Sequence, residues 1–257
     1  MENAEAVVLC GGLGSRLRPL TYYFQKTMLP IGREQRPILE YILRSLTYNG
    51  IRKAVLLANY KFEQIKNYFG NGSKFGLRVF YGMDPPTLSG SGGALLNAYN
   101  NGLINRDNTA LIYYGDILTT MNLRELLKQH EKSRAVATLA VSRELQLPVG
   151  VAKMHGKAII GFEEKPKVKI NVGTGIMAIS SGAVKVLEDL AESHNNIDIM
   201  RDLLPELLTR KMKVEGYTFD DFWLDVGSIE TYEKINHEKI DELFSKVLEI
   251  SKTERYV

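Results

Sequence analysis

Short apolar runs alternate with longer segments of helical periodicity in the first part of the chain. The runs rich in β-branched and aromatic residues predict strands at Ala6–Cys10, Lys53–Ala58, Leu77–Tyr81, Ala110–Tyr114 and Ala135–Val141. The amphipathic segments between them predict helices at Ile38–Asn49, Glu63–Phe69, Ala94–Asn101 and Leu123–Lys132. This alternation predicts an α/β fold with a mostly parallel sheet covered on both faces, and ligands outside the carboxyl ends of its strands.

The regular alternation of predicted strands and helices ends near residue 145. Shorter strands are predicted at Val149–Met154, Ala158–Phe162 and Thr174–Ile179, then helices at Ala183–Ala191 and Ile199–Arg210 and a strand at Val214–Phe219. One amphipathic helix is predicted from Ile229 to about Ile250. We expect a single domain over residues 1–257, with a soft division into parts at about 1–145, 146–227 and 228–250.

Composition narrows the classes of protein. The chain has 257 residues, 44% hydrophobic and 25% charged, as a globular protein does. Its 33 basic and 30 acidic residues are scattered without the charge blocks of nucleic-acid-binding arms. Cys10 is the only cysteine, which fits a reducing cytoplasm, and no secretory signal or membrane-spanning stretch is visible. We expect a soluble cytoplasmic protein without nucleic-acid or membrane partners.

A glycine-rich segment follows the first predicted strand. Residues 11–16 read Gly-Gly-Leu-Gly-Ser-Arg, and glycines at a strand's carboxyl end let backbone N–H groups approach phosphates. Leu17 stands where a dinucleotide fingerprint needs its third glycine, and the loop lacks the Gly-Lys-Ser/Thr of a P-loop. An NAD-dependent oxidoreductase is therefore disfavoured. Arg16 and Lys26 place two cations near the loop, which suits the binding of a polyphosphate. A glycine turn with solvated cations is the alternative interpretation of the same residues.

The longer string is more specific. Residues 11–21, Gly-Gly-Leu-Gly-Ser-Arg-Leu-Arg-Pro-Leu-Thr, followed by Lys26 and Leu29-Pro30-Ile31, closely resemble the opening of the nucleoside-diphosphate-sugar pyrophosphorylases, or sugar-1-phosphate nucleotidyltransferases. The resemblance implies a Rossmann-like three-layer sheet with a small mixed sugar-binding subdomain. It also implies a nucleotide-binding set of Leu9, Gly11, Gly12, Gly14, Ser15, Gly90 and Gly93.

Two later segments fit the nucleotide side of the same family. Residues 90–95, Gly-Ser-Gly-Gly-Ala-Leu, resemble the loop beside the nucleobase, where glycines permit close approach of a flat ring; a serine-capped helix start is the alternative. The apolar run Leu111–Tyr114 ends in Gly115-Asp116. A carboxylate at the carboxyl end of a parallel strand suits Mg²⁺, and the family uses this aspartate as a metal ligand. The alternative is a capping aspartate.

Two further segments fit the sugar side and the metal. Glu164-Lys165-Pro166 matches a family motif in which Glu164 would hold sugar hydroxyls and Lys165 the sugar phosphate; an exposed strand end is the alternative. Gly150, Thr174 and Gly175 complete the implied sugar set, and Gly173 replaces a frequent asparagine, which leaves the sugar open. Residues 223–228, Trp-Leu-Asp-Val-Gly-Ser, would supply Asp225 as the second Mg²⁺ ligand, with Ser228 as a helix N-cap.

The implied reaction converts a nucleoside triphosphate and a sugar 1-phosphate to a nucleoside-diphosphate sugar and pyrophosphate. Glucose 1-phosphate with dTTP or UTP is our first expectation, and mannose 1-phosphate with GTP the alternative. Choline-phosphate and molybdopterin nucleotidyltransferases share the glycine opening, but Arg18-Pro19-Leu20-Thr21 and Glu164-Lys165-Pro166 favour a sugar substrate. A non-catalytic regulatory subunit is disfavoured because the presumed catalytic set is complete: Arg16, Lys26, Asp116, Lys165 and Asp225. The resemblance leaves a homo-oligomer open.

Overall fold

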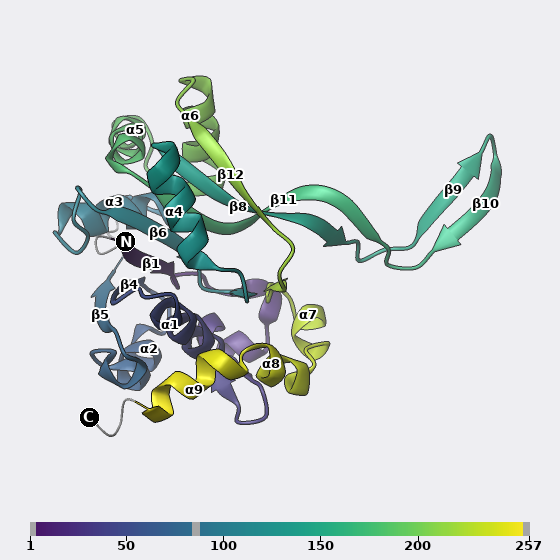
Figure 1. The fold of residues 1–257 in the computed structure, drawn as a ribbon, viewed down its shortest axis with the longest axis horizontal. Helices are drawn as coiled ribbons and strands as arrows, with labels where there is room; N and C mark the ends of the chain where they lie inside the picture. Colours follow the sequence, from purple (N-terminus) through teal and green to yellow (C-terminus); the bar gives the residue numbers. More distant parts are fainter. Residues whose placement is uncertain (1–3, 84–87, 254–257) are drawn as a thin grey trace.

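The computed structural model describes residues 4–83 and 88–253. Its centre is a seven-stranded sheet in the order β12-β8-β11-β6-β1-β4-β5 (Figure 1). The strands are β1 (Ala4–Leu9), β4 (Lys53–Leu57), β5 (Arg78–Gly82), β6 (Thr109–Tyr114), β8 (Ala137–Gln146), β11 (Lys167–Ile179) and β12 (Val214–Phe219). Only the two pairings made by β11 are antiparallel. The predicted mostly parallel α/β sheet is confirmed.

The interior strand β1 shows why the sheet needs cover on both sides. It pairs in parallel with β4 and β6, so that Val8 lies between Leu56 and Tyr113. Successive side chains point to opposite faces. Val8 therefore joins one buried cluster and Val7 the other. Burial on both faces explains the unbroken apolar run.

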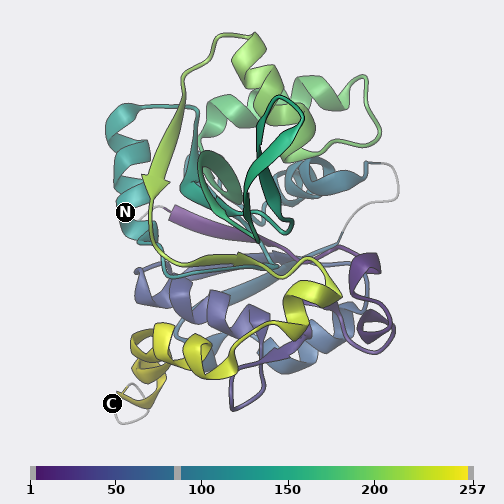
Figure 2. The ribbon, with the colours of Figure 1, turned by 90° about the vertical axis from the view of Figure 1, so that its right-hand side faces the viewer.

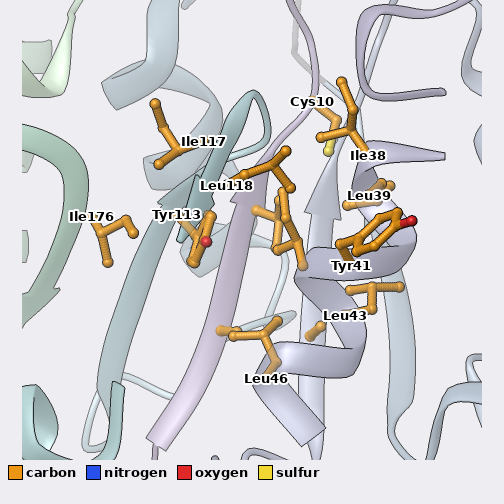
Figure 3. Packing of buried hydrophobic residues seen from close by; sticks show 14 of the residues in the cluster. Cys10, Ile38, Leu39, Tyr41, Leu43, Leu46, Tyr113, Ile117, Leu118 and Ile176 are labelled. Atoms are coloured by element: carbon orange, nitrogen blue, oxygen red, sulfur yellow. The ribbon is translucent and has the colours of Figure 1, made fainter. Parts of the chain in front are cut away.

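Helices cover each face of the sheet (Figure 2). One face carries α1 (Ile38–Tyr48), α2 (Phe62–Phe69) and α4 (Leu123–Ser133). The other carries α3 (Gly90–Asn100), α5 (Ser181–Ala191) and a π-helical turn, Ile199–Leu203, that continues into α6 (Leu204–Thr209). Figure 3 shows α1 on the first face, where Tyr41 and Tyr113 are fully or almost fully buried. This three-layer packing holds the carboxyl ends of the strands in fixed positions.

The predicted single helix from Ile229 to Ile250 is wrong. The segment forms three helices, α7 (Ile229–Glu233), α8 (His237–Leu243) and α9 (Ser245–Thr253). The Asn236 side chain accepts a hydrogen bond from the Lys239 amide and starts a new helix. Phe244 is 1% exposed and packs edge-on to Tyr41, with ring centroids 5.3 Å apart. The turns between the helices let this end of the chain follow the curved surface of its own domain.

Several short elements were not predicted. They are β2 (Pro30–Ile31), β3 (Arg36–Pro37), β7 (Ile117–Thr119), β13 (Trp223–Asp225) and 3₁₀ turns at Ser15–Leu17, Leu20–Tyr22, Lys26–Met28 and Ser73–Phe75. Two or three residues are too few to show a hydrophobic period. The β7–β13 pair matters most here because it carries residues of the candidate site.

A two-stranded arm projects from the body between β8 and β11 (Figures 1 and 2). It consists of β9 (Val151–His155) and β10 (Ala158–Glu163), which pair with each other in a sheet of their own. The division expected near residue 145 falls at the end of β8, whereas β11 and β12 belong to the main sheet. No helix among the described residues is long and apolar enough to cross a membrane.

Candidate active site

A cavity of about 550 Å³ opens at the carboxyl ends of β1, β4 and β6. This is the edge of the sheet at which a ligand was expected. Among the residues expected at the site, six line the cavity: Leu9, Gly11, Gly12, Lys26, Gly90 and Asp116. The lining also includes Tyr114 and Ser91, which were not predicted. The cavity therefore gathers five separate stretches of the sequence around one space.

Gly12 and Gly14 have different roles in the glycine loop. Gly12 is exposed, and a Cβ atom there would meet no protein atom within 4 Å, so the space above it is free for a ligand. Gly14 has φ +61°, and a Cβ there would lie 2.7 Å from Cγ2 of Thr21. The Thr21 hydroxyl donates to the Gly14 carbonyl at 2.8 Å. Gly14 and the neighbouring Ser15 therefore shape the turn from outside the cavity.

Gln25 is a site residue that sequence reasoning missed. Its side chain is fully buried and its amide nitrogen donates to the Cys10 carbonyl at the end of the first strand. Its Oε1 accepts hydrogen bonds from the Thr27 amide and hydroxyl, both at 2.6 Å. These bonds fix Lys26, which lies between Gln25 and Thr27, at the cavity wall. An uncharged residue gives no chemical signal in the sequence, and its only clue was its place directly before Lys26.

Two distant segments bring the predicted carboxylates together. The Lys26 ammonium forms an ion pair with the Asp116 carboxylate. In the β7–β13 pair, Asp225 is the register partner of Ile117, and the Val226 amide donates to the Asp116 carbonyl at 2.9 Å. Asp116 and Asp225 therefore occupy neighbouring positions on adjacent chain segments.

Arg16 joins this group from the glycine loop. A Cβ atom placed on Gly227 would lie 2.9 Å from Oδ1 of Asp225 and 3.2 Å from Nη2 of Arg16. The guanidinium and the carboxylate thus share the space that this glycine leaves open. We call Arg16, Lys26, Asp116 and Asp225 the charged cluster.

Attraction and repulsion both act on the Asp225 carboxyl within the charged cluster. Asp225 is exposed as a residue, but its carboxyl is partly screened from water. Burial and then the charge of Asp116 raise its pKa, although Lys26 and Arg16 act in the opposite direction. The two carboxylates therefore repel each other, and Lys26 and Arg16 act against that repulsion. A hard cation beside them would relieve this repulsion.

Cys10 lies at the end of the first strand and is buried. Burial raises the pKa of its thiol to about 12, opposed by a hydrogen bond with Thr27 and assisted by the charge of Asp116. A thiol with such a pKa is protonated at neutral pH. Cys10 therefore fills space in the core and does not act as a nucleophile.

The expected nucleobase loop is held by a segment before α6. Gly90 has φ +84°, and the Gly92 amide donates to the Ile197 carbonyl at 2.8 Å. The Ser91 hydroxyl donates to the Asp198 carboxylate at 2.9 Å. Gly93 does not line the cavity, and a Cβ there would lie 2.6 Å from the Leu88 carbonyl oxygen. Gly90 and Ser91 face the cavity, whereas Gly93 serves packing.

None of the residues expected to bind sugar lines this cavity: Gly150, Glu164, Lys165, Thr174 and Gly175. A Cβ on Gly150 would lie 2.8 Å from Oε2 of Glu164, so these two residues meet at the base of the arm. The Thr174 hydroxyl is buried and donates to the Ala140 carbonyl at 3.2 Å. Gly175 lies against the Tyr114 ring, 3.3 Å from a Cβ built there.

Lys165 lies at the arm base with φ +50°, a rare backbone conformation for a side chain with a Cβ. It is close enough to α7 for its charge to help lower the pKa of Glu230, after the larger effects of the hydrogen bond and charge of Lys234. Because α7 follows Asp225 in the chain, Lys165 faces the segment that carries the second carboxylate. The base of the arm therefore lies near α7, the helix that follows Asp225 in the chain.

The donors in the charged cluster suit magnesium when substrate phosphates are added. Within the described ranges no group of three or more His, Cys, Asp or Glu side chains could hold a metal ion. Mg²⁺ commonly binds one or two carboxylates together with phosphate oxygens and water. The Asp116–Asp225 pair fits this pattern and not that of a metal held by protein alone.

A family model described as nucleotidyl transferase matches residues 5–242. The chain belongs to this family. A D-glycero-α-D-manno-heptose 1-phosphate guanylyltransferase from Aneurinibacillus thermoaerophilus is 30% identical over 91% of this chain and 97% of its own length. A UTP–glucose-1-phosphate uridylyltransferase from Synechocystis is 29% identical over 89% of this chain. The match spans only 61% of that relative.

Solved structures agree on the fold. HddC from Yersinia pseudotuberculosis, crystallised with GMP-PN, superposes with a TM-score of 0.69 at 19% identity, covering 92% of this chain and 99% of that one. The expected membership among sugar-1-phosphate nucleotidyltransferases is confirmed by these relatives and the family model.

Proposed function

We propose that the protein joins a sugar 1-phosphate to a nucleoside triphosphate and releases pyrophosphate, with Mg²⁺ as cofactor. The observation that carries this proposal is the charged cluster at the mouth of a glycine-lined cavity. Two cations and two carboxylates from four separate chain segments meet where a triphosphate in the cavity would present its phosphates. Relatives named for this reaction class support the proposal.

The nucleophile needs no activation by a serine, cysteine or strong base. A phosphate oxygen of the sugar 1-phosphate already carries negative charge and attacks the α-phosphorus, while the bond to the β-phosphate breaks and pyrophosphate leaves with that electron pair. The barrier comes from repulsion between two polyanions and from the need for an in-line approach. Positioning and charge stabilisation therefore supply the catalysis.

The cations of the charged cluster take distinct roles in this scheme. Lys26, fixed by its Gln25 and Thr27 neighbours, stabilises the α-phosphoryl group as charge moves. Arg16, on the glycine loop, holds the departing pyrophosphate. Asp116 and Asp225 would hold Mg²⁺, which when bound neutralises phosphate charge and acts as a Lewis acid. Ionised carboxylates without that cation would repel the triphosphate.

The sugar substrate is assigned to the arm side of the charged cluster. Lys165 aligns the attacking phosphate, and Glu164 beside Gly150 accepts hydrogen bonds from sugar hydroxyls. Glucose 1-phosphate with dTTP or UTP is our substrate proposal, with mannose 1-phosphate and GTP as the competing pair. The single buried cysteine supports a cytoplasmic location.

A pyrophosphate-release screen tests the reaction and its substrates together. The common nucleoside triphosphates are crossed with glucose, mannose and heptose 1-phosphates, with and without Mg²⁺. Release confined to one pair and dependent on Mg²⁺ is expected. Triphosphate binding with no pyrophosphate release from any pair would instead support a regulatory subunit.

A further inference from the structure

Two glycines of β11 are surrounded by apolar atoms beside the nucleotide cavity. Gly173 is exposed, and a Cβ built there would lie 3.0 Å from Cδ2 of Leu139 and 3.5 Å from Cε of Met200. The nearest atoms to a Cβ on Gly175 belong to the Tyr114 side chain, which also lines the cavity. The atoms nearest to both glycines are therefore carbon. We call Tyr114, Leu139, Gly173, Gly175 and Met200 the apolar wall.

Met200 is tied to the loop that lines the cavity. The Ser91 hydroxyl donates to Oδ2 of Asp198 at 2.9 Å, and the Met200 amide donates to Oδ1 of the same carboxylate at 2.9 Å. The Ile199 amide donates to the Ser91 hydroxyl, also at 2.9 Å. Met200 lies in the π-helical turn, and such turns are frequent at functional sites. One carboxylate thus connects the Met200 backbone to a residue of the cavity wall.

The polar groups beside the apolar wall are already engaged. The Tyr114 hydroxyl donates to the Ser91 hydroxyl at 3.4 Å, and Ser91 in turn donates to Asp198. The Asp198 carboxylate also accepts the amides of Met200 and Arg201 at the start of the π-helical turn. A sugar hydroxyl that meets the apolar wall would therefore gain no hydrogen-bond partner from these groups without breaking an existing bond.

The apolar wall lies along β11 between the two proposed substrate positions. The strand begins at Lys167, shortly after Lys165, to which we assign the sugar phosphate. It then passes Gly173 and reaches Gly175 at the Tyr114 ring. Tyr114 ends β6 and lines the nucleotide cavity. A sugar held between these two positions would meet this part of the strand.

We propose that Met200 is a specificity-determining residue, and that the enzyme accepts a sugar 1-phosphate lacking the hydroxyl group that would face the apolar wall. This inference rests on the proposed nucleotidyl transfer. Methionine offers a polarizable thioether and a methyl group, with only weak capacity to accept hydrogen bonds. A site that hydrogen-bonds a hydroxyl rejects the deoxygenated analogue because its own polar groups are left unpaired. An apolar surface imposes no such penalty.

The first test compares glucose 1-phosphate with its singly deoxygenated derivatives in the pyrophosphate-release assay. One derivative should have a kcat/KM equal to or above that of glucose 1-phosphate. Loss of a hydroxyl that is hydrogen-bonded elsewhere in the site should lower kcat/KM about five- to a hundredfold. If the substrate screen selects another sugar 1-phosphate, the singly deoxygenated derivatives of that sugar are used.

The second test adds a hydrogen-bonding group to the apolar wall. Met200→Gln keeps the length of the side chain and supplies an amide. It should lower kcat/KM for the accepted deoxy derivative about tenfold relative to the fully hydroxylated sugar 1-phosphate. The KM for the triphosphate should stay the same, whereas a general structural defect would change both substrates.

A second variant supplies the amide from the strand. Gly173→Asn should shift the preference in the same direction, and the close Leu139 atom can yield because it is the end of a flexible side chain. Leu208→Gln is the matched control, since Leu208 is 57% exposed on α6, the helix into which the π-helical turn continues. The control should leave the preference unchanged. Circular dichroism checks that each variant is folded.

The outcomes separate this inference from the proposed function. Pyrophosphate release by the wild type with the same sugar preference in Met200→Gln and Gly173→Asn would overturn the role of Met200 and leave the proposed function standing. A wild type that rejects every deoxy derivative, or a Met200→Gln defect confined to the triphosphate, would do the same. An absence of release from every substrate pair would overturn both.

Discussion

The cavity side and the arm side of the molecule differ in how their candidate residues are held. Lys26 directly follows the fully buried Gln25, and Asp116 follows the buried strand β6. The two side chains form an ion pair with each other. Glu164 and Lys165 are exposed at the base of an arm whose own strands pack on nothing else in the described chain. The phosphate side is thus preorganised by the core of one chain. The sugar side depends on where the arm lies.

This difference shows how one fold can keep the same phosphate chemistry while the sugar substrate changes. Pyrophosphate release needs the same charges in the same places for every nucleotide sugar, and buried strands supply that precision. A projecting arm can change in sequence without disturbing the core, because its side chains are not packed against the main sheet. Variants on the two sides should therefore fail in different ways.

The largest effect is expected at Gly12. Gly12→Val would place a branched side chain in the open space of the cavity and should reduce triphosphate binding below detection, while the fold remains because no protein atom lies within 4 Å of the new Cβ. Gly216→Val, at an edge-strand position with only an ordinary 3.5 Å contact, is the control. Calorimetric titration of the triphosphate measures binding, and normal affinity in the Gly12 variant would remove the loop from the cradle.

The carboxylates come next. Asp116→Asn and Asp225→Asn should each lower kcat by about a thousandfold, the upper range for loss of one preorganised group. Asp221→Asn, an exposed aspartate on the same segment as Asp225, is the control. Steady-state rates across a magnesium titration measure the effect. Full activity of both Asn variants would contradict a shared metal site.

Asp225→Asn should also change the pH dependence of the melting temperature in a defined direction. Burial and Asp116 raise the pKa of Asp225 in the folded chain, so its contribution to stability is present at low pH and lost as pH rises through that pKa. Without substrate, Asp225→Asn should melt at an equal or higher temperature than wild type at neutral pH. The difference should shrink toward acid pH, where the native carboxyl is also neutral.

Substituting either cation of the charged cluster should cause the next largest loss of turnover. Lys26→Met or Arg16→Gln should lower kcat by about a hundred- to a thousandfold, because each removes one charge donor aimed at the phosphates. Arg18→Gln is the control: Arg18 is exposed in the same segment and lies over the Tyr22 ring, 5.2 Å from its centroid. Nearly normal turnover in either cluster variant would exclude that residue from the mechanism.

The arm side should show a smaller and more selective defect. Lys165→Ala should raise the KM for the sugar 1-phosphate about tenfold, the cost of one charge-assisted hydrogen bond, and change the KM for the triphosphate much less. Lys167→Ala removes a neighbouring exposed lysine whose 3.5 Å ion pair with Glu144 lies on the surface, and it should change neither value. A defect confined to the triphosphate would remove the distinction between the two sides.

The sequence predicted the charged residues of the site better than it predicted the uncharged residues that hold those side chains in place. Asp116 was predictable because an apolar strand ends in Gly-Asp, and Arg16 because it follows the glycines. Gln25 was not, since its role appears only when Cys10 and Thr27 surround it. The same limit applies to strands. The alternating pattern of residues 149–162 indicates a hairpin, but not whether that hairpin joins the main sheet or projects from it.

The pairing of β13 with β7 also sets the time at which the charged cluster can form. Chains fold from the N-terminus as they leave the ribosome. Lys26 and Asp116 lie in the first half of the chain, whereas Asp225 follows β12 and lies beside Asp116 through the pairing of β13 with β7. A half-made chain can therefore expose a glycine loop and one carboxylate, but not the pair. The complete pair of carboxylates therefore requires the last strands of the chain as well as the first.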